Sequence, residues 1–138
     1  MSTLMTKQWT RRVGALLAAV AMTVGLAACG GGDDDGGGNA YVEPKGASTA
    51  TIAVEAGNYY FEPDRISADA GIVTIKLTAK NGIHDFVFDG AYPGYRLEAD
   101  GGGGAQSEKI GLKSGKYTFY CSITGHRAQG MEGTLTVK

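Results

Sequence analysis

The fold is decided by residues 115–138, which read GKYTFYCSITGHRAQGMEGTLTVK. Apolar and polar side chains alternate over 117–121 and again over 131–137, and this period of two is typical of strands with one buried face. Cys121 and Met131 share the parity of the apolar residues in their runs, so we expect both sulfur atoms to face the core. The two runs therefore predict strands joined by a loop that is held at both ends.

Working outward, three upstream runs also carry strand patterns. Residues 48–56 are rich in Thr, Ile, Val and Ala, residues 73–80 alternate apolar with polar, and residues 84–89 alternate with His84 on the apolar parity. Glycine-containing turn signals separate these runs, and no helical period of comparable strength occurs. Short strands at this spacing predict an all-β, antiparallel β-sandwich. The least regular stretch, 89–107, is predicted to be a long loop with at most a helical turn.

The N-terminus has the three parts of an export signal. Basic residues at 7, 11 and 12 precede an apolar run over 13–26 and two small residues. Because that run is shorter than the roughly 20 residues that span a bilayer, we predict a signal peptide over 1–28 rather than an anchor helix. The tetrad Leu26-Ala27-Ala28-Cys29 resembles the bacterial lipoprotein box, which implies that Cys29 becomes the lipidated first residue. The alternative is an ordinary cleavage site beside a chance cysteine.

Residues 29–47 are dominated by glycine, aspartate and small polar residues. They contain too little apolar surface to offset chain entropy, so we predict a flexible tether between the lipidated cysteine and a domain over 48–138. That domain has roughly 90 residues, enough for one core. The whole chain carries 13 basic and 14 acidic residues without a basic cluster, which argues against nucleic acid as a partner. Nothing in the sequence indicates an oligomer, so a monomer is the prediction.

Side chains that bind soft metal ions are few in this sequence. The only histidines are His84 and His126, and Cys121 is the only cysteine besides Cys29. Met131 is the only methionine outside the predicted signal peptide. A lone cysteine in an exported domain cannot form an internal disulfide and needs another explanation. One thiolate, two imidazoles and a weak axial thioether form the ligand set of copper electron-transfer sites, so these residues predict one copper site.

The loop spacing resembles that of a known family. Phe119-Tyr-Cys121, four residues, His126, four more and Met131 are similar to the C-terminal copper loop of the plastocyanin/azurin family, the cupredoxins. Residues 61–84 are similar to the family segment that ends in the first histidine ligand, and the loop spacing is closest to that of the auracyanins. The resemblance covers nearly the whole domain.

This resemblance implies a Greek-key β-sandwich with one type 1 (blue) copper ion near one end. It implies His84, Cys121 and His126 as equatorial ligands and Met131 as the axial ligand, with redox proteins as partners. Electrons would leave through His126, within a ring of apolar side chains for which the candidates are Ile123, Ala128 and the pair Tyr92-Pro93.

Two residues leave alternatives open at the predicted site. Many relatives have asparagine directly after the first histidine, whereas this chain has Asp85. An ionised carboxylate beside the ligands would favour copper(II) and lower the reduction potential, unless the side chain points outward. Gln129 is an alternative axial ligand to Met131, because glutamine also serves in that position. The family spacing favours Met131.

The function predicted from these residues is one-electron transfer on an exported, lipid-anchored protein. The alternative is an extracytoplasmic copper carrier or reservoir that hands over the ion itself. Zinc fits less well because a thioether is not among its usual ligands. An enzyme is not predicted, because a catalytic copper centre would need further histidines and a nucleophilic cysteine would need an orienting third group. A non-metal adhesion module ranks after the copper carrier.

Overall fold

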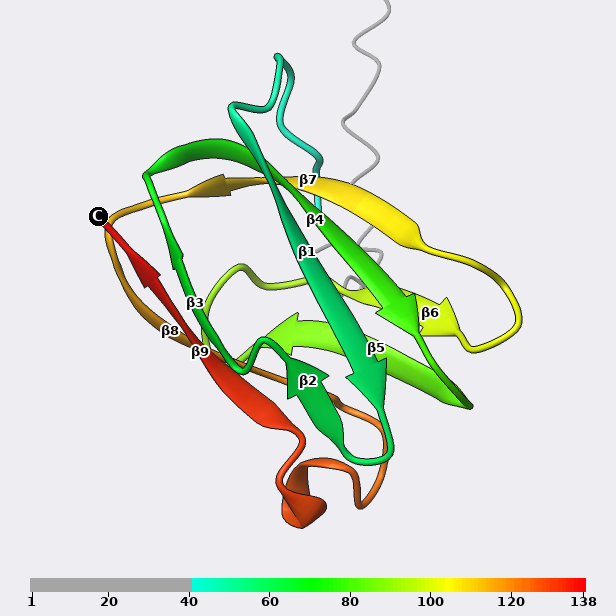
Figure 1. Ribbon diagram of the computed structural model, residues 1–138. Helices are drawn as coiled ribbons and strands as arrows, with labels where there is room; N and C mark the ends of the chain where they lie inside the picture. Colours follow the sequence, from blue (N-terminus) through cyan, green and yellow to red (C-terminus); the bar gives the residue numbers. More distant parts are fainter. Residues whose placement is uncertain (1–40) are drawn as a thin grey trace, which may run out of the picture. The chain divides into compact units, whose positions relative to one another are not determined.

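The computed structural model describes residues 41–138 (Figure 1). The predicted signal peptide 1–28, the lipidation site Cys29 and the tether as far as residue 40 lie outside the described residues. Residues 41–138 form nine strands and one short 3-10 helix, η1 (Arg127–Gln129). No helix in this part of the chain is long and apolar enough to cross a membrane.

The strands form two sheets that pack face to face. The four-stranded sheet has the order β2-β1-β4-β7 and contains β1 (Ala50–Gly57), β2 (Tyr60–Glu62), β4 (Gly71–Ala79) and β7 (Gln106–Leu112). The five-stranded sheet has the order β3-β9-β8-β5-β6 and contains β3 (Arg65–Ala68), β5 (Ile83–Phe88), β6 (Leu97–Asp100), β8 (Gly115–Tyr120) and β9 (Glu132–Val137). The predicted all-β, Greek-key sandwich is confirmed.

Two strand pairs differ from the expected antiparallel arrangement. β1 pairs with β4 in parallel, and β3 pairs with β9 in parallel. The chain leaves the first sheet after β2, enters the second sheet as β3 and returns to the first as β4 (Figure 1). This crossing allows strands that are not consecutive to lie side by side in the same direction, since a parallel pair needs a crossover connection rather than a hairpin.

The core between the sheets contains a cluster of three phenylalanines. The rings of Phe86 and Phe119 are stacked with centroids 4.4 Å apart, and Phe61 contacts both edge-on. Phe86 lies two residues after His84, and Phe119 lies two residues before Cys121. Because alternate residues of a strand share a face, Phe86 and Phe119 lie on the same face of the sheet as the predicted ligands His84 and Cys121. Burying each such ring stabilises the fold by about 1.5–3 kcal/mol.

The predicted loop over 89–107 contains strand β6 and no helix. Leu97 and Ala99 alternate inward and are buried, and β6 pairs with β5 at the sheet edge. A strand of four residues between turns carries too short an alternation to stand out from a loop in the sequence.

Residues 41–47, which the sequence assigned to the tether, lie against the domain. The Tyr41 hydroxyl donates to the Lys109 carbonyl at 2.9 Å, and its ring contacts Tyr95 edge-on with centroids 5.0 Å apart. The Glu43 carboxylate accepts from the Lys109 backbone N–H at 3.3 Å, and the Gly46 carbonyl accepts from the Lys109 ammonium at 3.2 Å. These contacts attach the segment to β7.

Candidate metal centre

The two ends of the connection between β8 and β9 are joined by the backbone. Cys121 directly follows β8 and Met131 directly precedes β9, and the Cys121 N–H donates to the Met131 carbonyl at 3.1 Å. The Met131 N–H in turn donates to the His126 carbonyl at 3.2 Å. Figure 1 shows this connection, in orange, at the end of the sandwich where β1 turns into β2. The loop is therefore held at both ends, as predicted.

Two glycines and one arginine shape the loop. Gly125 and Gly130 have φ values of +84° and +98°, which few other residues adopt, so the backbone can curl around His126. Arg127 pairs with Asp89 at 2.7 Å and with Glu132 at 2.9 Å, and it tethers η1 to the ends of β5 and β9.

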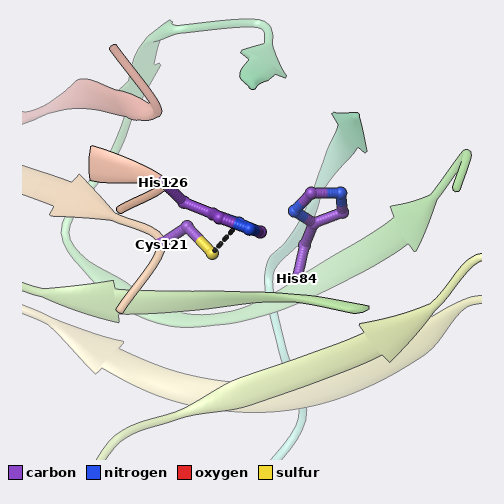
Figure 2. A group of neighbouring side chains, drawn as sticks. All are labelled: His84, Cys121 and His126. Carbon is purple, nitrogen blue, oxygen red and sulfur yellow. Dashed lines mark hydrogen bonds between the residues drawn. The ribbon is translucent and has the colours of Figure 1, made fainter. Parts of the chain in front are cut away.

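Three of the predicted ligands converge. One ligand atom from each of His84, Cys121 and His126 lies within 4.8 Å of the other two. The Cys121 Sγ lies 3.4 Å from His126 Nδ1, and the two imidazole centroids are 5.1 Å apart (Figure 2). Imidazole and thiolate ligands lie about 2.0–2.3 Å from a metal ion, so a trigonal set requires ligand atoms about 3.5–4 Å apart. The triad fits one ion.

The His84 side chain has the properties of a ligand rather than of a core histidine. It is fully buried, and neither ring nitrogen has a hydrogen-bond partner among residues 41–138. A buried polar group left unpaired costs about 1–3 kcal/mol, which a coordinated metal ion would offset. Burial, aided by repulsion from His126, lowers the pKa of His84. Its imidazole is therefore neutral at physiological pH, which is the form that binds metal ions.

Ionisation of the Cys121 thiol requires a cation nearby. The side chain is fully buried, and this burial raises the pKa of the thiol. The backbone N–H of Asp85 lies 3.5 Å from Sγ and acts in the opposite direction, because it donates to the sulfur. A metal ion at the triad would stabilise the thiolate, since a coordinating thiol is deprotonated.

His126 is the ligand candidate nearest to solvent. It is half-buried, whereas His84 and Cys121 are fully buried. Tyr59, on the turn after β1, contacts the His126 ring edge-on with centroids 4.9 Å apart. Sequence reasoning missed Tyr59, because its contact with His126 arises from the turn between two strands of the opposite sheet.

Of the residues predicted to form an apolar ring around His126, Ile123 and Ala128 stay a prediction. Ile123 is half-buried against the core, and Ala128 is exposed on η1 in the copper loop. The pair Tyr92-Pro93 was a wrong prediction. The Tyr92 hydroxyl accepts from the Lys113 N–H at 2.9 Å, and Lys113 precedes β8 whereas Cys121 follows it. Tyr92 therefore lies toward the opposite end of β8.

Asp85 is buried beside the site rather than pointing into solvent. Its carboxylate accepts from the Ser122 N–H at 2.6 Å and from the Ser122 hydroxyl, and it pairs with Arg96 at 2.8 Å. Sequence reasoning singled out Asp85 but missed Ser122 and Arg96. The position of Ser122 directly after Cys121 was the available signal for one of them.

Met131 and Gln129 differ in burial. Met131 is fully buried beside Cys121, whereas Gln129 is exposed on η1. The place of Met131 as the fourth ligand stays a prediction.

Comparison with known proteins identifies the family. Residues 48–138 match the family of copper binding proteins described as the plastocyanin/azurin family. The chain belongs to the plastocyanin/azurin family. This membership and the fit of the triad identify copper as the cofactor of this cupredoxin, and together they support copper-mediated electron transfer.

Individual relatives agree with this assignment. The cupredoxin is 38% identical over 98 residues to plastocyanin from Dryopteris crassirhizoma, covering 61% of this chain and 93% of the relative. It is 33% identical over 103 residues to plastocyanin from Prochlorothrix hollandica, covering 67% and 76%. The structure of auracyanin B superposes with a TM-score of 0.55 at 21% identity, covering 74% of this chain and 96% of the other, and supports the fold.

Proposed function

We propose that this cupredoxin is a one-electron carrier, not an enzyme, whose single type 1 copper ion cycles between copper(I) and copper(II). The proposal rests on one observation, the convergence of three side chains at one point. The His84 imidazole comes from β5, and the buried Cys121 thiol and the His126 imidazole come from the loop between β8 and β9. Bound copper would supply the one-electron couple. A thiolate favours copper(I) and imidazole tolerates copper(II), so a site between the two preferences needs little rearrangement when the electron moves.

The protein frame suits that role because it limits movement of the ligands. Cys121 is fixed by its backbone bond to Met131, and the loop is tied to Asp85 through Ser122. Phe86 and Phe119, each two residues from a ligand candidate, stack on each other in the core. His126 provides the half-buried edge through which an electron would reach a redox partner protein.

We propose Met131 as the axial ligand. Its full burial, its position directly before β9 and its backbone bonds to Cys121 and His126 support this assignment. The exposed position of Gln129 is less suited to coordination.

We propose that the protein is exported and held at a membrane by lipid on Cys29, with the domain facing away from the cytoplasm. The support is the order of basic residues, apolar run and Leu26-Ala27-Ala28-Cys29 tetrad in the sequence. Because membrane attachment confines the carrier to a surface, its redox partners are proposed to work at that membrane.

Spectroscopy and voltammetry of the mature chain test the proposal. Copper(II) loading should give an intense blue absorption band and one copper per chain, with fast, reversible one-electron voltammetry. The alternative of a copper carrier or reservoir predicts readily exchanged copper with slow electrochemistry. The closed burial of His84 and Cys121 disfavours such exchange. A colourless copper adduct would contradict the proposed electron carrier.

A further inference from the structure

A buried charged network lies directly behind the copper loop. Asp85 has the opposite parity to His84 and Phe86 on β5, yet its side chain is fully buried. Its backbone N–H lies 3.5 Å from the Cys121 sulfur, while its carboxylate binds the Ser122 N–H. Asp85 therefore contacts both a proposed ligand and the residue that follows it.

Within the described part of the chain, the carboxylate of Asp85 has one counter-ion. Among residues 41–138, Arg96 is the only basic side chain within ion-pair distance, with Nε 2.8 Å from Oδ2. The same guanidinium binds Glu98 at 2.9 Å. Asp85 and Glu98 are cross-strand partners of β5 and β6, and like charges in such positions repel each other. Arg96 therefore offsets two facing carboxylates at once.

We infer that Arg96 is a positioning residue that neutralises Asp85, holds it against the Cys121-Ser122 backbone and thereby sets the reduction potential of the copper site. The inference rests on the proposed electron-carrier function. A fully buried carboxylate without its partner would place uncompensated negative charge beside the ligands. Negative charge stabilises the more positive oxidised ion, so loss of Arg96 lowers the potential.

Voltammetry of four copper-loaded proteins tests this inference: the natural chain, Arg96→Gln, Asp85→Asn and the double variant. Arg96→Gln should make reduction about tenfold less favourable, because the half-exposed guanidinium is partly screened by solvent. A tenfold change corresponds to a potential lower by about 59 mV for a one-electron couple. Adding Arg96→Gln to Asp85→Asn should shift the potential much less, since the buried carboxylate beside the ligands is gone and the remaining partner of Arg96, Glu98, is half-exposed.

Two controls separate a positioning role from a general charge effect. Arg65→Gln removes the same charge from an exposed position on β3 and should not shift the potential measurably. Arg96→Lys keeps the positive charge, so its potential should lie close to that of the natural chain. The remaining difference reports the loss of the forked guanidinium. An unchanged potential in Arg96→Gln, or an equal shift in the Asp85→Asn background, would overturn the inference. If Arg96→Gln folds only when Asp85→Asn is also present, the loss depends on the Asp85 carboxylate and supports the inference; if neither variant folds, Arg96 acts on the fold independently of Asp85 and the inference is overturned.

Unfolding of the copper-free proteins gives an independent readout. Arg96→Gln should lower the urea midpoint of the natural chain, and the same change in the Asp85→Asn background should lower it much less. Equal losses in both backgrounds would show that Arg96 does not act through Asp85. Failure of the natural chain to form a blue site would contradict the proposed function, whereas this copper-free comparison would still report on the Arg96–Asp85 pair.

Discussion

The backbone N–H of Cys121 donates to the carbonyl of Met131 at 3.1 Å, so the loop that carries His126 starts and finishes at one hydrogen-bonded pair. The last paired residues of β8 and β9 are Tyr120 and Glu132. The Cys121–Met131 hydrogen bond therefore extends this pairing by one residue on each strand. Both sulfur-bearing residues are fully buried. The strand pairing thus fixes the backbone of two proposed ligands before any metal binds.

Cys121→Ala should abolish the blue absorption band of the copper-loaded protein, because that band arises from charge transfer between sulfur and copper. The two imidazoles would remain, so residual copper(II) binding without the blue colour is the expected result. Absorption and electron paramagnetic resonance spectra measure it, with Cys29→Ser as the matched control that retains the colour. A blue band in Cys121→Ala would exclude Cys121 as a ligand.

Met131→Gln should keep the blue colour but shift the reduction potential, because the axial bond is weak and glutamine can also occupy the axial position. Voltammetry of the variant beside the natural chain measures the shift. Gln129→Ala, at the exposed position on η1, should change neither colour nor potential. Complete loss of copper binding in Met131→Gln would mean that Met131 has another role.

Cys29→Ser should release the protein from membranes, because serine cannot carry the lipid of a bacterial lipoprotein box. Fractionation of cells that express either form, with detection of the protein in the membrane and soluble fractions, measures the release. Unchanged membrane association of the variant would contradict the proposed lipid anchor.

Gly133→Ala should destabilise the copper-free domain by about 1–3 kcal/mol, the usual cost of overpacking a filled core. A Cβ at this position would overlap the ring of Phe119, its cross-strand partner, and the carbonyl of Asp64. Urea unfolding measures the loss. Gly111→Ala is the control on β7, where an added Cβ meets no atom of residues 41–138 within 4 Å, and it should leave stability close to that of the natural chain. Equal stability of both variants would contradict the described packing.

The sequence predicted the parts of the site that repeat a strand period or a spacing. Alternation placed Cys121 and Met131 on the buried parity, and both are fully buried. The scarcity of histidine and cysteine identified His84, Cys121 and His126, which the structure brings together. These features depend only on neighbouring residues or on a fixed spacing, so they can be recognised in a single sequence.

Features that depend on contacts between distant segments could not be predicted. The parallel pairing of β3 with β9 depends on how the chain crosses between the sheets. Arg96 meets Asp85 only because β5 and β6 pair in one particular register. Tyr92 was misplaced because the turns after β5 carry no period that shows to which end of the sandwich they return.

With the proposed lipid on Cys29, the docking of residues 41–47 on β7 would limit how far the copper domain can move from a membrane. If Cys29 is held in a lipid layer, only residues 29–40 are left to separate the domain from that layer. Fully extended, such a span reaches roughly 40 Å, and a random coil of that length averages about 20 Å. A carrier attached by so short a segment would exchange electrons with proteins in or on the same membrane. It would not reach proteins across a wide compartment.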